Sequence, residues 1–274
     1  AQFGADHERL EYAHRSALGE LGRATDSGQR HLQQAVGRHV ARQDLGDARL
    51  HVGAGEQVLG LGEAGAERLL GIGVLAGGDD GAVHLGVPMA QYRFQPNPPD
   101  DYFAWLGRFA PDKGPHLAIA AAKQAGVRLI LAGIVEHGIK ESADYFRDQI
   151  EPFIDGDQIQ FVGPANMEQK LRLLGHARGF LNPITWEEPG ATVVIEAMAL
   201  GCPVIGFARG VVPELILHGE TGFLVHNVEE MVQHIPRIGE IDRLATHTHV
   251  DRNLSSRAMA EKYVAIYEQL IEGR

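Results

Sequence analysis

The feature that most constrains the fold is an alternation of short apolar runs and helical patterns between residues 102 and 225. Six apolar runs are predicted as strands, at 102–106, 127–132, 159–162, 179–181, 203–206 and 223–225. The segments between them are predicted as helices, at 116–125, 142–150, 167–176, 192–200 and 213–218, and a last helix is predicted at 256–271. Asn166 and Gln169 resemble a capping box at the start of the third helix. This alternation predicts an α/β domain with a Rossmann-like parallel sheet and helices on both faces.

In such a sheet ligands bind beyond the carboxyl ends of the strands, so the loops that follow the strands are the candidate site. One of these loops enters the helix at 192–200 and carries Glu188, Gly190, Ala191 and Thr192. The first N–H groups of a helix have no intrahelical partner and lie at the positive end of its dipole. Small residues there let an anion approach the backbone closely. We therefore expect an anionic ligand at this helix N-terminus.

Glu196 lies on the second turn of the same helix, within the otherwise apolar run TVVIEAMAL. In a purely structural interpretation, Glu196 is a surface carboxylate and Glu188 favours the helix N-terminus. A lone carboxylate in so apolar a helix is costly without a partner or a ligand, which favours a functional role for Glu196. Two carboxylates that flank an anion site suit a ligand with hydroxyl groups on both sides of a charged centre, as in a nucleotide-sugar.

Arg108 and Lys113 lie in the loop GRFAPDKG, which begins with Gly107 after the first predicted strand. An Arg fork and a Lys charge on one loop can converge on a diphosphate. The alternative is a solvated basic pair on a surface loop, and the pair in isolation favours that alternative. Together with the helix N-terminus, the two cations would stabilise a departing diphosphate without a metal ion.

Residues 1–80 differ in composition from the rest of the chain. They contain no Pro, Lys or Asn, and β-branched and aromatic residues are scarce. Two weak helical patterns, at 5–19 and 29–43, accompany several glycines. We expect a weakly structured or helical segment at 1–80, followed by a ligand-binding domain at 81–274.

Gly60, Gly62 and Gly65 spell the Gly-x-Gly-x-x-Gly pattern of a dinucleotide-binding turn. The structural context is wrong, because only about five residues are left for a helix before Gly71, whereas a crossover helix needs roughly ten or more. A glycine-rich stretch also produces this pattern by chance. A dinucleotide-dependent oxidoreductase is therefore the weaker functional alternative.

Charge and cysteine content exclude other classes. A formal net charge of −11 argues against nucleic acid as a partner and against an anionic membrane surface. The single cysteine, Cys202, is predicted to be a small core residue and makes a cytoplasmic setting the default. No apolar run has the roughly 18–20 residues of a membrane span, and no signal-peptide core is present. His247 and His249 would point the same way on a strand, but no suitable third ligand is near, so no metal site is predicted.

The stretches GRFAPDKG, FVGPANMEQKLRLLGHA and WEEPGATVVIEAMALGCPVIGFARGVVPELILHGETGFLV carry a resemblance to a known family. Together they resemble the C-terminal, donor-binding half of a family 4 retaining glycosyltransferase of the GT-B fold. The resemblance runs from about Gly81 to the C-terminal helix. It implies that Arg108 and Lys113 grip the donor diphosphate, that Glu188 contacts hydroxyls of the transferred sugar and that Glu196 holds the nucleotide ribose.

The resemblance also implies that Gly190, Ala191 and Thr192 lie where backbone amides meet the sugar and the phosphates, and Gly107 is placed with these donor-binding residues. The common motif at this point is Glu-Pro-Phe-Gly-Leu, whereas this chain has Glu188-Pro189-Gly190-Ala191-Thr192. The aromatic residue of the motif is missing, which leaves the identity of the sugar open.

The family transfers a sugar, here expected to be a hexose, from a nucleoside-diphosphate sugar to an acceptor with retention of configuration, usually without a metal or other cofactor. The acceptor is not specified by the sequence, and peripheral contact with a membrane or with an acceptor-binding domain is compatible with the resemblance. Family members carry an N-terminal α/β acceptor domain that residues 1–80 do not match. We hypothesise that residues 1–80 come from a shifted or unrelated reading frame. The alternative function is a truncated module that binds a nucleotide-sugar but lacks transfer activity alone.

Overall fold

The computed structural model describes residues 49–51, 58–60, 83–136 and 138–271 of the 274-residue chain. Met89–Asn253 forms one compact unit, and the residues on either side of it form a second. The predicted helical pieces at 5–19 and 29–43 lie outside the described residues, as do Gly62 and Gly65 of the glycine motif. The predicted boundary at residue 80 stays a prediction.

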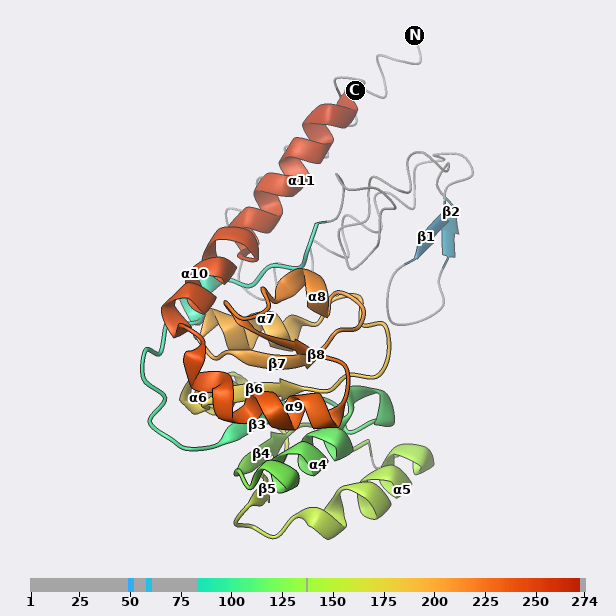
Figure 1. Cartoon of the computed structure of the whole chain (residues 1–274). Helices are drawn as coiled ribbons and strands as arrows, with labels where there is room; N and C mark the ends of the chain where they lie inside the picture. Colours follow the sequence, from blue (N-terminus) through green and yellow to red (C-terminus); the bar gives the residue numbers. More distant parts are fainter. Residues whose placement is uncertain (1–48, 52–57, 61–82, 137, 272–274) are drawn as a thin grey trace. The chain divides into compact units, whose positions relative to one another are not determined.

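The larger unit is built on a parallel sheet of six strands (Figure 1). They are β3 (Phe103–Leu106), β4 (Leu129–Ala132), β5 (Ile159–Phe161), β6 (Gly179–Asn182), β7 (Val204–Phe207) and β8 (Gly222–Val225). Their order across the sheet is β5-β4-β3-β6-β7-β8, and every neighbouring pair is parallel. The predicted α/β fold with a Rossmann-like sheet is confirmed.

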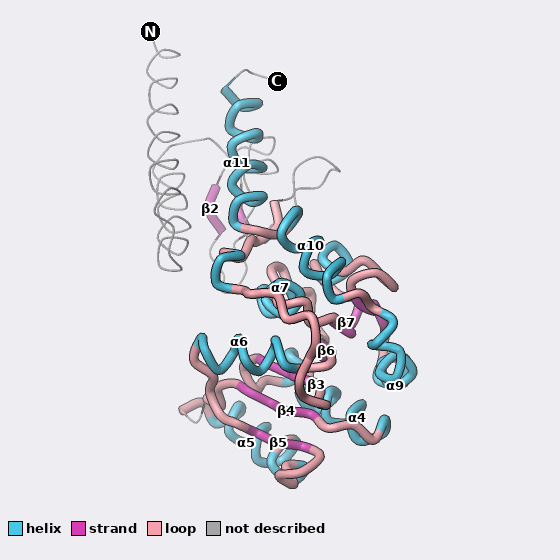
Figure 2. Tube along the Cα trace, turned by 90° about the vertical axis from the view of Figure 1, so that its left-hand side faces the viewer, coloured by secondary structure: helices cyan, strands magenta, loops and turns pink. Residues whose placement is uncertain are grey.

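Helices cover both faces of this sheet (Figure 2). Right-handed crossovers put α4 and α5 on one face and α6 and α7 on the other. The helix α9 packs beside α4, and α10 packs beside α7. The bounds are α4 (Pro115–Ala125), α5 (Lys140–Gln149), α6 (Met167–His176), α7 (Thr192–Ala199), α8 (Val212–Leu215), α9 (Val228–His234) and α10 (Arg243–Asn253), with 3-10 turns η1 (Met89–Gln91), η2 (Pro111–Lys113), η3 (Glu151–Phe153) and η4 (Ile235–Glu240).

The predicted helices are confirmed, although α8 is shorter than predicted, and α9 and α10 were not predicted. The capping box of α6 is confirmed, since the Gln169 amide donates to Asn166 Oδ1 and the Asn166 amide to Gln169 Oε1, each at 2.9 Å. The placement of His247 and His249 on a strand was wrong, because both lie on α10. Packing beside α7 overrides the weak helix propensity of the Thr and His residues of α10. Asp242 precedes α10 and caps its N-terminus, since its Oδ1 accepts a hydrogen bond from the Leu244 amide at 2.8 Å. An Asp at this position is a sequence signal for the start of a helix.

In the second unit, β1 (Arg49–His51) and β2 (Val58–Gly60) form an antiparallel pair within the segment expected to be weakly structured or helical. Hairpin pairing satisfies their backbone despite the scarcity of β-branched residues. The predicted last helix is confirmed as α11 (Ser256–Ile271). The backbone of Val87 pairs with the start of α11, because the Ser256 amide donates to the Val87 carbonyl at 2.9 Å. No helix among the described residues is both long and apolar enough to cross a membrane.

An aromatic cluster fixes the loop that leaves β3. Phe109 is fully buried, and its ring centroid lies 4.9 Å from that of Trp105, 5.0 Å from that of Phe146 and 5.1 Å from that of Phe161. The Phe109 amide also donates to the Ile134 carbonyl at 3.0 Å. Because Phe109 lies between Arg108 and η2, this burial positions the backbone of the whole basic loop.

Two half-buried histidines are held in their neutral form. Burial lowers the pKa of His116 and of His249 below the ordinary value of 6.5. In His249, Nε2 donates to the Leu215 carbonyl at 3.1 Å and Nδ1 accepts from Asn253 Nδ2 at 3.3 Å. A second ring proton would place a donor opposite the Asn253 donor, so the folded state favours the neutral ring.

The free energy of unfolding is therefore expected to be largest above pH 6.5 and to fall as the pH drops below this value, because the unfolded chain binds these protons more readily. Urea unfolding at about pH 7.5 and about pH 5.5 measures the difference. His249→Gln keeps a donor for the Leu215 carbonyl but does not titrate, so its loss of stability between the two pH values should be smaller than that of the wild type. An equal loss in both proteins would contradict the role of His249.

Candidate functional site

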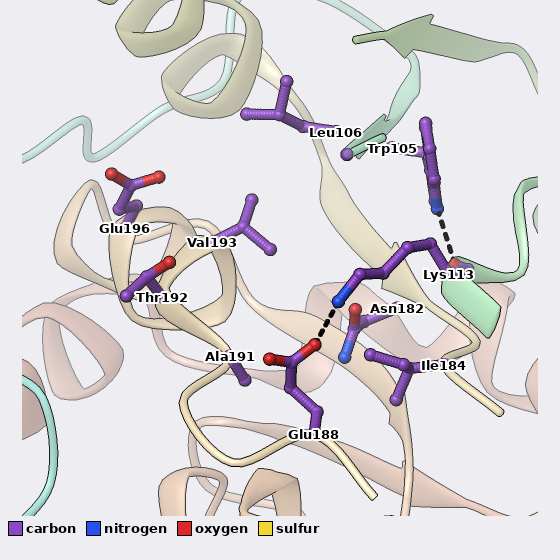
Figure 3. A pocket seen from close by; sticks show the side chains of 11 residues that line it. Trp105, Leu106, Lys113, Asn182, Ile184, Glu188, Ala191, Thr192, Val193 and Glu196 are labelled. Atoms are coloured by element: carbon purple, nitrogen blue, oxygen red, sulfur yellow. Dashed lines mark hydrogen bonds and ion pairs between the residues drawn. The ribbon is translucent and has the colours of Figure 1, made fainter. Parts of the chain in front are cut away.

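A pocket opens at the carboxyl edge of the sheet, between the loops that follow β3 and β6 (Figure 3). These strands are neighbours, but the chain continues from β3 to β4 on one side and from β6 to β7 on the other. At such a reversal of strand order the two loops separate and leave a crevice. The lining residues are Trp105, Leu106, Gly107, Lys113, Asn182, Ile184, Glu188, Ala191, Thr192, Val193 and Glu196.

Lys113 and Glu188 meet in this pocket as an ion pair between Nζ and Oε2, and their side chains are 24% and 15% exposed. Trp186 contacts both partners. Its Nε1 donates to Glu188 Oε2 at 3.1 Å, and Lys113 Nζ lies 4.8 Å from its ring centroid. An ammonium near an aromatic face is attracted by the ring quadrupole, so Trp186 positions both charges. Sequence reasoning missed Trp186, although its place directly before the two glutamates was a signal.

Close contact between two loops places Lys113 at the end of β6. Gly114 has φ of 67°, and a Cβ atom there would lie 2.0 Å from the Pro183 carbonyl oxygen. The Thr185 amide donates to the Asp112 carbonyl at 2.9 Å. A glycine is required at position 114 both by this left-handed conformation and by the lack of space.

The loop after β7 holds the backbone of Glu188. The Val211 amide donates to the Glu188 carbonyl at 2.9 Å, and the Gly210 amide donates to Glu187 Oε2 at 2.7 Å. Gly210 has φ of 54°, and a Cβ atom there would lie 2.3 Å from the Glu188 carbonyl oxygen. Glu188 is thus fixed by its backbone as well as by its side chain.

Glu196 faces the pocket from α7 and also has protein partners. Its Oε1 accepts from the Tyr92 hydroxyl at 2.8 Å and forms an ion pair with Lys170 Nζ. The side chains of Lys170 and Glu196 are 21% and 15% exposed. Sequence reasoning missed these partners, which supply the compensation that a carboxylate in an apolar helix needs. Both contacts end on Oε1.

Ala191 precedes α7 with φ of 42° and ψ of 43°, the left-handed conformation, and it is the single non-glycine residue with positive φ in the described ranges. The helix begins at Thr192 directly after it, without a side-chain cap. Thr192 and Val193 of the first turn line the pocket. The N–H groups of a first helical turn have no intrahelical partner and suit an anion.

The structure brings six of the predicted site residues together at this pocket, namely Gly107, Lys113, Glu188, Ala191, Thr192 and Glu196. Gly190 and Arg108 are not among the lining residues. The Arg108 side chain is 51% exposed, and its Nη1 lies 3.4 Å from Glu136 Oε2. Within the described ranges, no three His, Cys, Asp or Glu side chains are grouped to hold a metal ion.

Comparison with known proteins identifies a family model that matches this chain and solved structures that share its fold. The family model "Glycosyl transferases group 1" matches residues 90–249. Spore coat protein SA of Bacillus subtilis (strain 168) is 27% identical over 180 residues, which are 60% of this chain and 48% of that protein. D-inositol 3-phosphate glycosyltransferase of Mycobacterium marinum is 29% identical over 167 residues, 60% of this chain and 34% of that protein. The chain thus spans less than half the length of these two relatives.

Solved structures share the sheet and its helices. AviGT4, a glycosyltransferase involved in avilamycin A biosynthesis, matches with a TM-score of 0.61 and 29% identity over 73% of this chain and 61% of that one. HepE of Anabaena, solved in complex with UDP and glucose, matches with a TM-score of 0.57 and 21% identity over 72% of this chain and 59% of that one.

The left-handed conformation of Ala191 predicts an unusual response to substitution. Ala191→Gly removes a conformational cost of roughly 1–2 kcal/mol and should leave the free energy of unfolding equal or higher. Ala191→Val should lower it by about 1–3 kcal/mol, because a β-branched residue is poorly accommodated there. Urea unfolding measures both. As a matched control, Ala121→Gly in the middle of α4 should cost about 1 kcal/mol or more; an equal loss for Ala191→Gly would contradict the strain at position 191.

Proposed function

The chain belongs to the glycosyl transferases group 1 family, and we propose that it transfers a hexose from a nucleoside-diphosphate sugar to an acceptor with retention of configuration, as in family 4. The observation that carries this proposal is the meeting of Lys113 and Glu188 at the N-terminus of α7, in the crevice where the strand order reverses. A cation and helix amides suit a diphosphate, and a carboxylate beside them suits sugar hydroxyls.

In this proposal the diphosphate binds to Lys113 and to the first-turn amides of α7. Arg108 reaches it by leaving Glu136, which its exposed position and long ion-pair distance of 3.4 Å permit. The bond between the anomeric carbon and the diphosphate oxygen breaks, and its electron pair goes to the diphosphate. The acceptor oxygen forms the new bond on the same face of the sugar, and its proton goes to the departing diphosphate oxygen. Groups aimed at the charge that develops on a leaving group give the largest electrostatic contribution to such a reaction.

The two carboxylates accept hydrogen bonds from hydroxyl groups of the ligand. Glu188 exchanges the Lys113 ammonium for hydroxyls of the transferred sugar when Lys113 turns to the diphosphate. Glu196 receives the ribose hydroxyls, since both of its protein contacts end on Oε1 and a carboxylate has about four acceptor positions. HepE, which shares the fold, was solved with UDP and glucose, so this fold is able to hold such a ligand.

A second candidate is a module that binds the nucleotide-sugar without transferring it alone. The pocket has a volume of about 270 Å³, slightly below the roughly 300–1,000 Å³ of typical ligand pockets. A nucleotide-sugar would extend beyond it. The remaining expectations of a cytoplasmic setting, an unspecified acceptor and no cofactor stay part of the proposal. The oxidoreductase alternative loses its support, since the family is that of glycosyltransferases.

Removing either cation should weaken the binding of a nucleoside diphosphate. Arg108→Ala and Lys113→Met are each expected to cost about 1.5–3 kcal/mol, the size of one charge-assisted hydrogen bond. Calorimetric titration with UDP, GDP and ADP measures the dissociation constants. Arg147→Ala is the matched control, because Arg147 is a 59% exposed arginine that is also engaged in ion pairs. Unchanged affinity in Lys113→Met would refute the diphosphate site.

Turnover separates the enzyme from the binding module. Each nucleotide-sugar that binds the chain is incubated with it, with water as the acceptor that takes the sugar, and release of the nucleoside diphosphate is followed over time. Release that depends on Lys113 is expected for the enzyme, because departure of the diphosphate is the step that Lys113 assists. Saturable binding without release would favour the module.

A further inference from the structure

One buried side chain in the pocket has an unused hydrogen-bond donor. Asn182 is the last residue of β6, at the centre of the sheet, and is 6% exposed. Its backbone pairs with Gly206 of β7, which fixes the position of the side chain. Among the buried side-chain polar atoms of the described residues, Asn182 Nδ2 is the one without a hydrogen-bond partner.

Packing gives no reason for an amide at this position. Leu181 directly before it and Ile184 two residues after it are buried and apolar, and a leucine has the same branched arrangement of side-chain heavy atoms as asparagine. An amide N–H that is buried without a partner destabilises a fold. Such a group is expected where a ligand, rather than the protein, completes its hydrogen bond.

The neighbours of Asn182 indicate the chemistry of that ligand. Its side chain lies beside Lys113 and Glu188 at the wall of the pocket (Figure 3). Lys113 supplies the positive charge for an anion, whereas Asn182 supplies a neutral donor next to the carboxylate acceptor of Glu188. A neutral donor beside an acceptor matches a hydroxyl group, which accepts one hydrogen bond and donates another.

We propose that Asn182 is a sugar-binding residue, whose Nδ2 donates to a hydroxyl oxygen of the transferred sugar on the side that Glu188 contacts. This inference rests on the proposed function. In this structure the Lys113–Glu188 ion pair lies beside Asn182 in the pocket. When the diphosphate draws Lys113 away, Glu188 and Asn182 face the sugar together.

The test compares each nucleotide-sugar with its own nucleoside diphosphate. Calorimetry with UDP-glucose and UDP, GDP-mannose and GDP, and ADP-glucose and ADP is carried out on the full chain. Asn182→Leu is expected to weaken binding of the nucleotide-sugar by about three- to tenfold, the size of one neutral hydrogen bond, and to leave the nucleoside diphosphate unchanged. Its melting temperature without ligand should equal or exceed that of the wild type, because an unpaired buried donor is removed. Asn182→Ala provides a second variant without added branching if the leucine variant does not fold.

Thr221→Val is the matched control. Thr221 is also buried, but its Oγ1 accepts the Leu217 amide at 2.9 Å, so this variant should melt at a lower temperature and bind both ligands as the wild type does. Unchanged nucleotide-sugar affinity in the Asn182 variants would overturn the inference and leave the proposed function standing. Equal weakening for the nucleotide-sugar and the nucleoside diphosphate would place the amide at the phosphates and overturn the assignment to the sugar. If the wild type binds none of the three nucleotide-sugars, the proposed function fails, and this inference fails with it.

Discussion

The pocket exists because β3 and β6 are neighbours in the sheet while the chain leaves them on opposite sides. The crossover after β3 leads to α4 on one face, and the one after β6 leads to α7 on the other. Among the described residues neither crossover fills the space between the two loops, and side chains from both line it. Phe109 anchors the first loop in the core, and Gly210 lets the loop after β7 press against the second. Lys113 and Glu188, which are 75 positions apart in the chain, meet as a result.

In the larger unit, the succession of strands and helices along the chain was predictable, because it follows from local sequence patterns. Buried parallel strands appear in the sequence as continuous apolar runs, and the loops at 107–113 and 188–192 follow the ends of two of them, where ligands bind in such sheets. Tertiary pairing was not predictable. The Tyr92 hydroxyl donates to Glu196, which lies 104 positions away in the chain. The exposed Arg108 side chain pairs with Glu136 instead of lining the pocket. The helix α10 escaped prediction for a related reason, since its Thr and His residues have weak helix propensity and its packing beside α7 is a tertiary contact.

Both carboxylates that line the pocket are matched by a lysine. Glu188 pairs with Lys113, and Glu196 pairs with Lys170, with all four side chains largely buried. Removing water from a charge is costly, and a partner offsets most of that cost. Each lysine thus offsets the cost of placing a carboxylate in an apolar setting. In the proposed function, the ligand replaces the Lys113 partner of Glu188 instead of binding to an unpaired charge.

The pairing of Lys113 with Glu188 also has a kinetic consequence. An ammonium that is already neutralised projects little field into the solvent, and the chain as a whole carries a net charge of −11. In the proposed function, a doubly charged anion that diffuses toward this face gains little long-range attraction and is repelled by the net charge, so its encounter rate is expected to rise with ionic strength as this repulsion is screened. Selection among anions would then take place after encounter, by how well each one displaces Glu188 from Lys113.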